Sequence, residues 1–109
     1  NLEEIANYYI AYDKLMQHWH ELMPGVIYDI EYEQLVNNSE AETKRLLAFC
    51  DLPWQAQCLR FYDNKSASTT ASAAQVRQPI YNHSVAKWRH YEKELVPLIQ
   101  RLKAAEINL

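Results

Sequence analysis

Residues 26–32 read V-I-Y-D-I-E-Y, and this stretch decides the predicted fold class. Apolar and polar side chains alternate along it with a period of two, which predicts a β-strand. A lone strand cannot satisfy its own backbone hydrogen-bonding groups. We therefore expect its partner strands to lie outside the 109 residues, and we expect the unpaired edges to promote self-association. One face of this predicted strand comprises Val26, Tyr28, Ile30 and Tyr32.

An amphipathic helix is predicted before the strand. Apolar residues recur every three or four positions over residues 3–23, which is the period of one helix face. Pro24-Gly25 ends this helix. The stripe is rich in tyrosine, and we expect it to pack into a core; a row of rings facing a ligand is the alternative. It comprises Ile5, Tyr8, Tyr9, Tyr12, Leu15, Met16, Trp19, Leu22 and Met23.

Helices are also predicted after the strand. Ser39 and Glu42 have the spacing of a capping box and predict a helix that continues through Cys50. Glu40 and Lys44 are spaced for an ion pair on that helix. Helix, strand and helix in succession are typical of an α/β unit. The predicted fold class is therefore mainly α with one principal β-strand. Further helices are expected up to about residue 62, over 84–91 and over 92–105.

Composition and charge restrict the possible functions. The net charge is −3, but residues 1–43 carry one lysine against nine acids, whereas residues 44–109 carry ten basic residues against five acids. The second part therefore suits an anion, although duplex DNA would require a more basic domain. Gly25 is the sole glycine, which excludes a glycine-rich phosphate loop within these residues. No His or Cys pair has a zinc-site spacing, so we expect no metal site. We expect Cys50 and Cys58 to be reduced and partly buried.

Residues 63–75 differ from the rest of the chain because they are small and polar, and their composition predicts a mobile loop. Pro79 then biases Gln78 toward extended backbone. Hydroxyl side chains in this region are followed by cations, and both donate hydrogen bonds to phosphate oxygens. An anion site is one interpretation, and a solvated loop leading into a surface helix is the other. The residues concerned are Ser68, Thr69, Thr70, Ser72, Arg77, Lys87 and Arg89.

Two segments carry a family resemblance. Residues 70–81 read T-A-S-A-A-Q-V-R-Q-P-I-Y, and residues 84–91 read S-V-A-K-W-R-H-Y. Together they resemble the C-terminal signature of sulfotransferases that use 3′-phosphoadenosine 5′-phosphosulfate. The nearest resemblance is to tyrosylprotein sulfotransferase-like enzymes and to bacterial sulfotransferases with tetratricopeptide repeats. The upstream D-I-E-Y-E-Q-L-V and L-L-A-F-C-D-L-P-W fit the same family in the same order. The resemblance spans roughly residues 3–100.

The resemblance implies a P-loop-type α/β fold, of which residues 1–109 would be the C-terminal part. It implies that Tyr32 contacts the nucleotide donor and that Ser72 stabilises the transferring sulfuryl group. It implies that Lys87 binds the nucleotide and that residues 63–75 belong to a nucleotide-covering loop. The implied donor-binding segment after Ser72 comprises Ala73, Ala74, Gln75, Val76, Arg77, Gln78, Pro79, Ile80 and Tyr81.

The resemblance also implies partners and missing parts. The family's phosphosulfate loop and general base carboxylate are not among these residues, and the chain starts at Asn1 without a methionine. We therefore expect a fragment that is inactive alone and that pairs with the N-terminal half of its domain. The implied acceptor is a hydroxyl group of a protein tyrosine, a sugar or a small molecule. A bacterial-type enzyme would be cytoplasmic, and a tyrosylprotein sulfotransferase would lie in the Golgi lumen. The alternative function is a noncatalytic helical domain that binds a partner protein.

Overall fold

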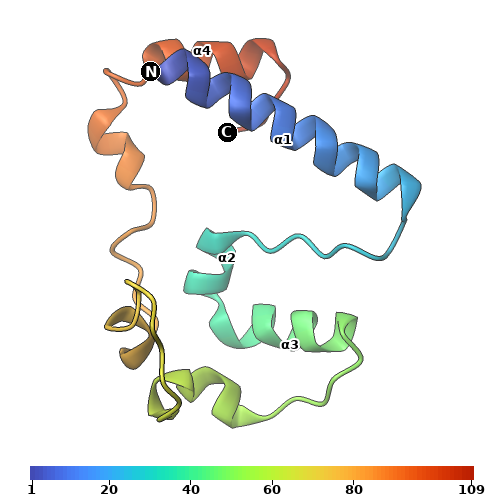
Figure 1. Ribbon diagram of the computed structural model, residues 1–109, viewed down its shortest axis with the longest axis vertical. Helices are drawn as coiled ribbons and strands as arrows, with labels where there is room; N and C mark the ends of the chain where they lie inside the picture. The colour runs from blue at the N-terminus through green and yellow to red at the C-terminus, as the bar shows by residue number, and fades with distance from the viewer. The chain divides into compact units, whose positions relative to one another are not determined.

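The computed structural model describes residues 1–109 and contains helices but no β-strand (Figure 1). The chain forms two compact units, of which one comprises residues 1–27 and 86–109 and the other comprises residues 28–85. The α-helices are α1 (Leu2–Leu22), α2 (Tyr32–Asn37), α3 (Ser39–Phe49) and α4 (Val96–Ala104). Short 3₁₀ helices are η1 (Ala56–Asp63), η2 (Gln75–Arg77) and η3 (Lys87–Tyr91).

The predicted strand over residues 26–32 is wrong. Residues 27–31 have no regular secondary structure, although Glu31 has extended backbone with φ −84° and ψ 120°. An extended segment becomes a strand only when a neighbour accepts and donates ladder hydrogen bonds, and no segment of the chain does so. The chain instead turns into α2 at Tyr32, and the Leu35 amide donates to the Glu31 carbonyl at 2.9 Å. Without a strand, the expected self-association through open strand edges loses its basis.

The first unit is built from α1 and α4, which lie side by side in Figure 1. The prediction of the first helix is confirmed, and its first turn is closed by a reciprocal capping box between Asn1 and Glu4. Gly25 follows with φ +76°, a left-handed backbone that glycine adopts without steric cost. The last helix begins at Val96, later than expected, because Pro97 fits only the first turn of a helix.

The apolar stripe of α1 is mostly exposed, so the expectation that it packs into a core is wrong for this chain. Ala6 and Leu102 are the buried hydrophobic residues of the structure, whereas Tyr8 is 81% exposed. The chain exposes 8972 Å², whereas two separate compact units of half its mass would together expose about 7,600 Å². Helix α1 forms as predicted, but its apolar face is not covered by the rest of the 109 residues.

The second unit packs α2 and α3 together with η1 and η2. The Tyr28 and Phe49 rings lie 4.9 Å apart between centroids, which places the segment before α2 against the end of α3. The predicted pair of Lys44 with Glu40 is confirmed at 2.6 Å. The predicted capping box at Ser39 is wrong, because α3 starts at that residue and its N-cap makes no side-chain hydrogen bond.

No helix of the structure combines the length and the apolar character needed to cross a membrane.

Candidate functional site

A cavity of about 190 Å³ in the second unit collects several of the sequence-predicted site residues, and we call it the Tyr32 cavity. Its walls come from α2, from η1 and from the segment that contains η2 and the residues after it. Residues more than 40 positions apart in the sequence therefore face one space. The lining residues are Tyr32, Leu35, Val36, Phe61, Gln75, Gln78, Pro79, Ile80 and Tyr81.

Local sequence explains how Tyr32 and the facing segment reach this cavity. Tyr32 is the first residue of α2, and Leu35 and Val36 follow one turn later on the same side of that helix. On the other wall, Gln78 has extended backbone with φ −117° and ψ 150°, as the sequence predicted from Pro79. Extended backbone at Gln78 ends η2 and directs the next residues along the cavity.

The cavity is aromatic and open to solvent. Tyr32 is 46% exposed, Phe61 is 37% exposed and Ile80 is 38% exposed, so their ring and aliphatic surfaces are available to a ligand. The amides of Gln75 and Gln78 add groups that can both donate and accept hydrogen bonds. The volume is below the roughly 300–1,000 Å³ typical of complete small-molecule sites. The Tyr32 cavity therefore suits one planar part of a ligand.

Ser72 is exposed and is not among the residues that line the Tyr32 cavity. Its carbonyl accepts hydrogen bonds from the amides of Gln75 at 2.9 Å and Val76 at 3.2 Å, which makes it the start of the turn that leads into η2. Ala73 and Ala74 lie within that turn. The structure thus places Ser72 three residues before the cavity wall, on the same continuous segment.

Arg77 directs its guanidinium group to a neighbouring loop. Nη1 donates to the Asn64 carbonyl at 2.5 Å and Nη2 donates to the Ser66 carbonyl at 2.8 Å. We call these two hydrogen bonds the Arg77 bridge. The Ser66 amide also donates to the Asn64 side chain at 2.9 Å, so the loop that accepts the bridge is itself turned back locally.

Lys87 lies in the other unit, where it opens η3. The residue before it, Ala86, has left-handed backbone with φ 53°. For a residue with a β-carbon this conformation costs on the order of 1–3 kcal/mol, and such strain clusters at functional sites. Lys87 is exposed, so its ammonium group is accessible to an anion.

The sequence alone did not identify three residues of the cavity. Phe61, Leu35 and Val36 line the cavity, although no site role was predicted for them. His83 stacks on Tyr81 with ring centroids 4.0 Å apart and planes 7° apart, which fixes one ring at the end of the cavity wall. Aromatic residues on both sides of the polar loop were the available signal, but composition does not show which of them converge.

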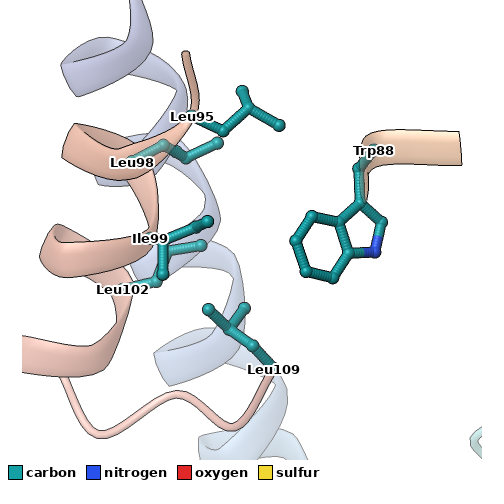
Figure 2. A pocket seen from close by; sticks show the side chains of 6 residues that line it. All are labelled: Trp88, Leu95, Leu98, Ile99, Leu102 and Leu109. Carbon is teal, nitrogen blue, oxygen red and sulfur yellow. The ribbon is translucent and has the colours of Figure 1, made fainter. Parts of the chain in front are cut away.

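A second cavity of about 200 Å³ lies in the first unit (Figure 2). Figure 2 shows the Trp88 ring from η3 facing leucine and isoleucine side chains of α4 and of the residues before and after this helix. No charged or amide side chain lines it, so it offers a ligand almost no specific hydrogen bonding. Its lining residues are Trp88, Leu95, Leu98, Ile99, Leu102 and Leu109.

Metal ligands and cysteines do not form a further centre. No group of three or more His, Cys, Asp or Glu side chains is arranged to hold a metal ion. Cys50 and Cys58 are free thiols, and both are exposed, so the expectation that they are partly buried is wrong. Cys50 directly follows α3 and Cys58 lies within η1, and little of the chain covers either of them.

Comparison with known proteins identifies the family. A model described as "Sulfotransferase family" matches residues 1–56, which include α1, α2, α3 and Tyr32. An "Uncharacterized protein" of Aquifex aeolicus (strain VF5) is 47% identical over 89 residues. Those residues are 82% of this chain but 12% of that protein, so the chain spans about an eighth of the relative's length. No solved structure matches. Because the family model covers more than half of its residues, this chain belongs to the sulfotransferase family.

Proposed function

We propose that the Tyr32 cavity is part of the donor site of a sulfotransferase that transfers a sulfuryl group from 3′-phosphoadenosine 5′-phosphosulfate to a hydroxyl acceptor. The supporting observation is the convergence of Tyr32, from the segment that matches the family model, with Gln75 and Gln78–Tyr81, from the segment that resembles the donor-binding signature. In this proposal, residues 1–109 are the C-terminal part of the catalytic domain.

The chemistry of the cavity favours the adenine ring as the part of the donor that binds there. An open aromatic wall stacks on a purine, and two glutamine amides suit its ring nitrogens and amino group. The sulfuryl and phosphate groups then extend along the segment toward Ser72. Sulfuryl transfer resembles phosphoryl transfer because charge spreads over peripheral oxygens, so positioned donors supply most of the catalysis.

We assign Ser72 to the transferring group and Lys87 to the nucleotide phosphates. A hydroxyl donates to a sulfuryl oxygen without bringing a competing charge, whereas an ammonium group is a compact charge suited to phosphate. Residues 63–75 cover the bound nucleotide in this proposal. A place among the tyrosylprotein sulfotransferase-like or tetratricopeptide-repeat bacterial enzymes, with a cytoplasmic location for the latter, is part of the same proposal.

Replacing Tyr32 by alanine tests the adenine site. Loss of a stacking ring costs about 1–3 kcal/mol in nucleotide-binding systems, so Tyr32→Ala should weaken binding of 3′,5′-adenosine bisphosphate about tenfold or more. Isothermal titration calorimetry on the full-length protein measures this change directly.

Two matched variants control that experiment. Tyr32→Phe keeps the ring and should retain most of the affinity. Tyr8→Ala removes a ring from the exposed face of α1, outside the cavity, and should leave the affinity unchanged. Equal losses of affinity in Tyr8→Ala and Tyr32→Ala would contradict the assignment of Tyr32 to the donor site.

The isolated 109 residues should not transfer sulfuryl groups. In this proposal the family's phosphosulfate loop and its general base lie outside residues 1–109, in which Gly25 is the sole glycine. Release of 3′,5′-adenosine bisphosphate from the donor in the presence of a phenol acceptor is the measurement. Turnover above the buffer rate would contradict the assignment of residues 1–109 to one part of a catalytic domain.

The exposed stripe of α1 favours a second candidate function, which is binding of a partner protein without catalysis. Five large apolar residues on that helix are at least 50% exposed. A thermal shift of the full-length protein with 3′,5′-adenosine bisphosphate separates the two candidates. The donor site predicts a rise in melting temperature through mass action, whereas a noncatalytic interaction domain predicts none. The five residues are Ile5, Tyr8, Tyr12, Leu15 and Leu22.

A further inference from the structure

We propose that Arg77 is a positioning residue of the donor site, which holds η1 and the η2 segment, two of the three elements that line the Tyr32 cavity, together through the Arg77 bridge; this inference rests on the proposed function. The family resemblance placed Arg77 in the donor-binding segment without a defined role. In the structure both of its terminal nitrogens donate to backbone carbonyls of the same unit.

The bridge joins two of the elements that line the cavity. Arg77 is the last residue of η2 and lies between the lining residues Gln75 and Gln78. Its acceptor Asn64 directly follows η1, the helix that supplies Phe61 to the cavity. The two hydrogen bonds span 13 and 11 positions of the sequence, and they therefore fix the separation of η1 from η2.

Arginine suits this role better than other cations. Its planar guanidinium group presents several N–H groups in fixed directions and meets two carbonyls of one turned loop at once. The bridge thus orders the loop before the nucleotide arrives and lowers the cost of ordering it on binding.

Limited proteolysis measures the bridge without any ligand, because Lys65 lies between the two acceptor residues. In the full-length protein, Arg77→Gln should raise the rate of trypsin cleavage after Lys65 about tenfold, as expected for loss of hydrogen bonds from a charged donor. Arg60→Gln removes the same charge from η1 without removing the bridge, and its cleavage rate should equal that of the wild type. An unchanged rate in Arg77→Gln would overturn the proposal.

Ligand comparison separates a positioning residue from a phosphate ligand. Arg77→Gln should weaken the binding of 3′,5′-adenosine bisphosphate, adenosine 5′-phosphate and adenosine by the same factor of about ten, because all three ligands contact the same cavity residues. If Arg77 instead contacted one phosphate, its replacement would leave the affinity for the ligand lacking that phosphate unchanged. This pattern would overturn the positioning role. If wild-type protein binds none of the three, the proposed function fails, whereas the cleavage rate after Lys65 still supports or overturns the bridge.

Discussion

Ser72→Ala in the full-length enzyme should lower kcat by roughly 10²–10³, with a much smaller change in the donor KM. Loss of one well-placed donor to developing negative charge has an effect of this size. The hydroxyl of Ser72 is assigned to the sulfuryl oxygens, where charge grows in the transition state, so its removal should affect the transition state more than the ground state. Steady-state kinetics with varied donor and saturating acceptor measure both constants.

Ser68→Ala is the matched control for this prediction. Ser68 carries the same hydroxyl in the same polar segment but lies before the residues that resemble the donor-binding signature. Its replacement should leave kcat near the wild-type value. If Ser68→Ala loses activity while Ser72→Ala keeps it, the alignment of this segment with the family is wrong by four residues, and the assignment of Ser72 falls. If both variants are silent, the loop has no catalytic role.

Lys87→Ala should raise the donor KM by about 10- to 100-fold and change kcat much less. A charged hydrogen bond to phosphate contributes about 1.5–3 kcal/mol. Because the nucleotide phosphates keep their charge throughout the reaction, this interaction is made equally in the ground and transition states. The affinity of 3′,5′-adenosine bisphosphate, which lacks the sulfuryl group, should fall by the same factor.

Lys93→Ala provides the control for charge alone, because this exposed lysine lies in the same unit, after η3. Its removal should leave the donor KM unchanged at physiological salt, where isolated surface charges are largely screened. A kcat defect in Lys87→Ala with an unchanged donor KM would contradict the assignment of Lys87 to nucleotide binding. An equal rise of the donor KM in both variants would mean that the effect comes from overall charge and not from a contact of Lys87 with the nucleotide.

Local sequence signals determined the helices well. The period of the apolar residues in residues 3–23 and the stop at Pro24-Gly25 predicted α1 nearly to its ends. Pro79 predicted extended backbone at Gln78, and the Glu40–Lys44 spacing predicted an ion pair. Each of these features depends on interactions between residues close in sequence, namely backbone sterics, capping and side chains one helical turn apart.

Tertiary contacts decided the features that the sequence left open or predicted wrongly. Alternation in residues 26–32 shows which faces a strand would have but not whether a neighbouring strand exists, and here none does. The α1 stripe likewise shows an apolar face without showing what covers it.

For the candidate site, too, local sequence and tertiary structure determined different features. The sequence by itself determined which residue types suit a nucleotide, and the resemblance selected Tyr32, Ser72 and Lys87. Only the tertiary structure brought Phe61 and Tyr32 to the same cavity and turned Arg77 toward the Asn64 and Ser66 carbonyls. Contacts between residues more than ten positions apart depend on how the chain folds back on itself, which neither the period nor the composition of one segment encodes.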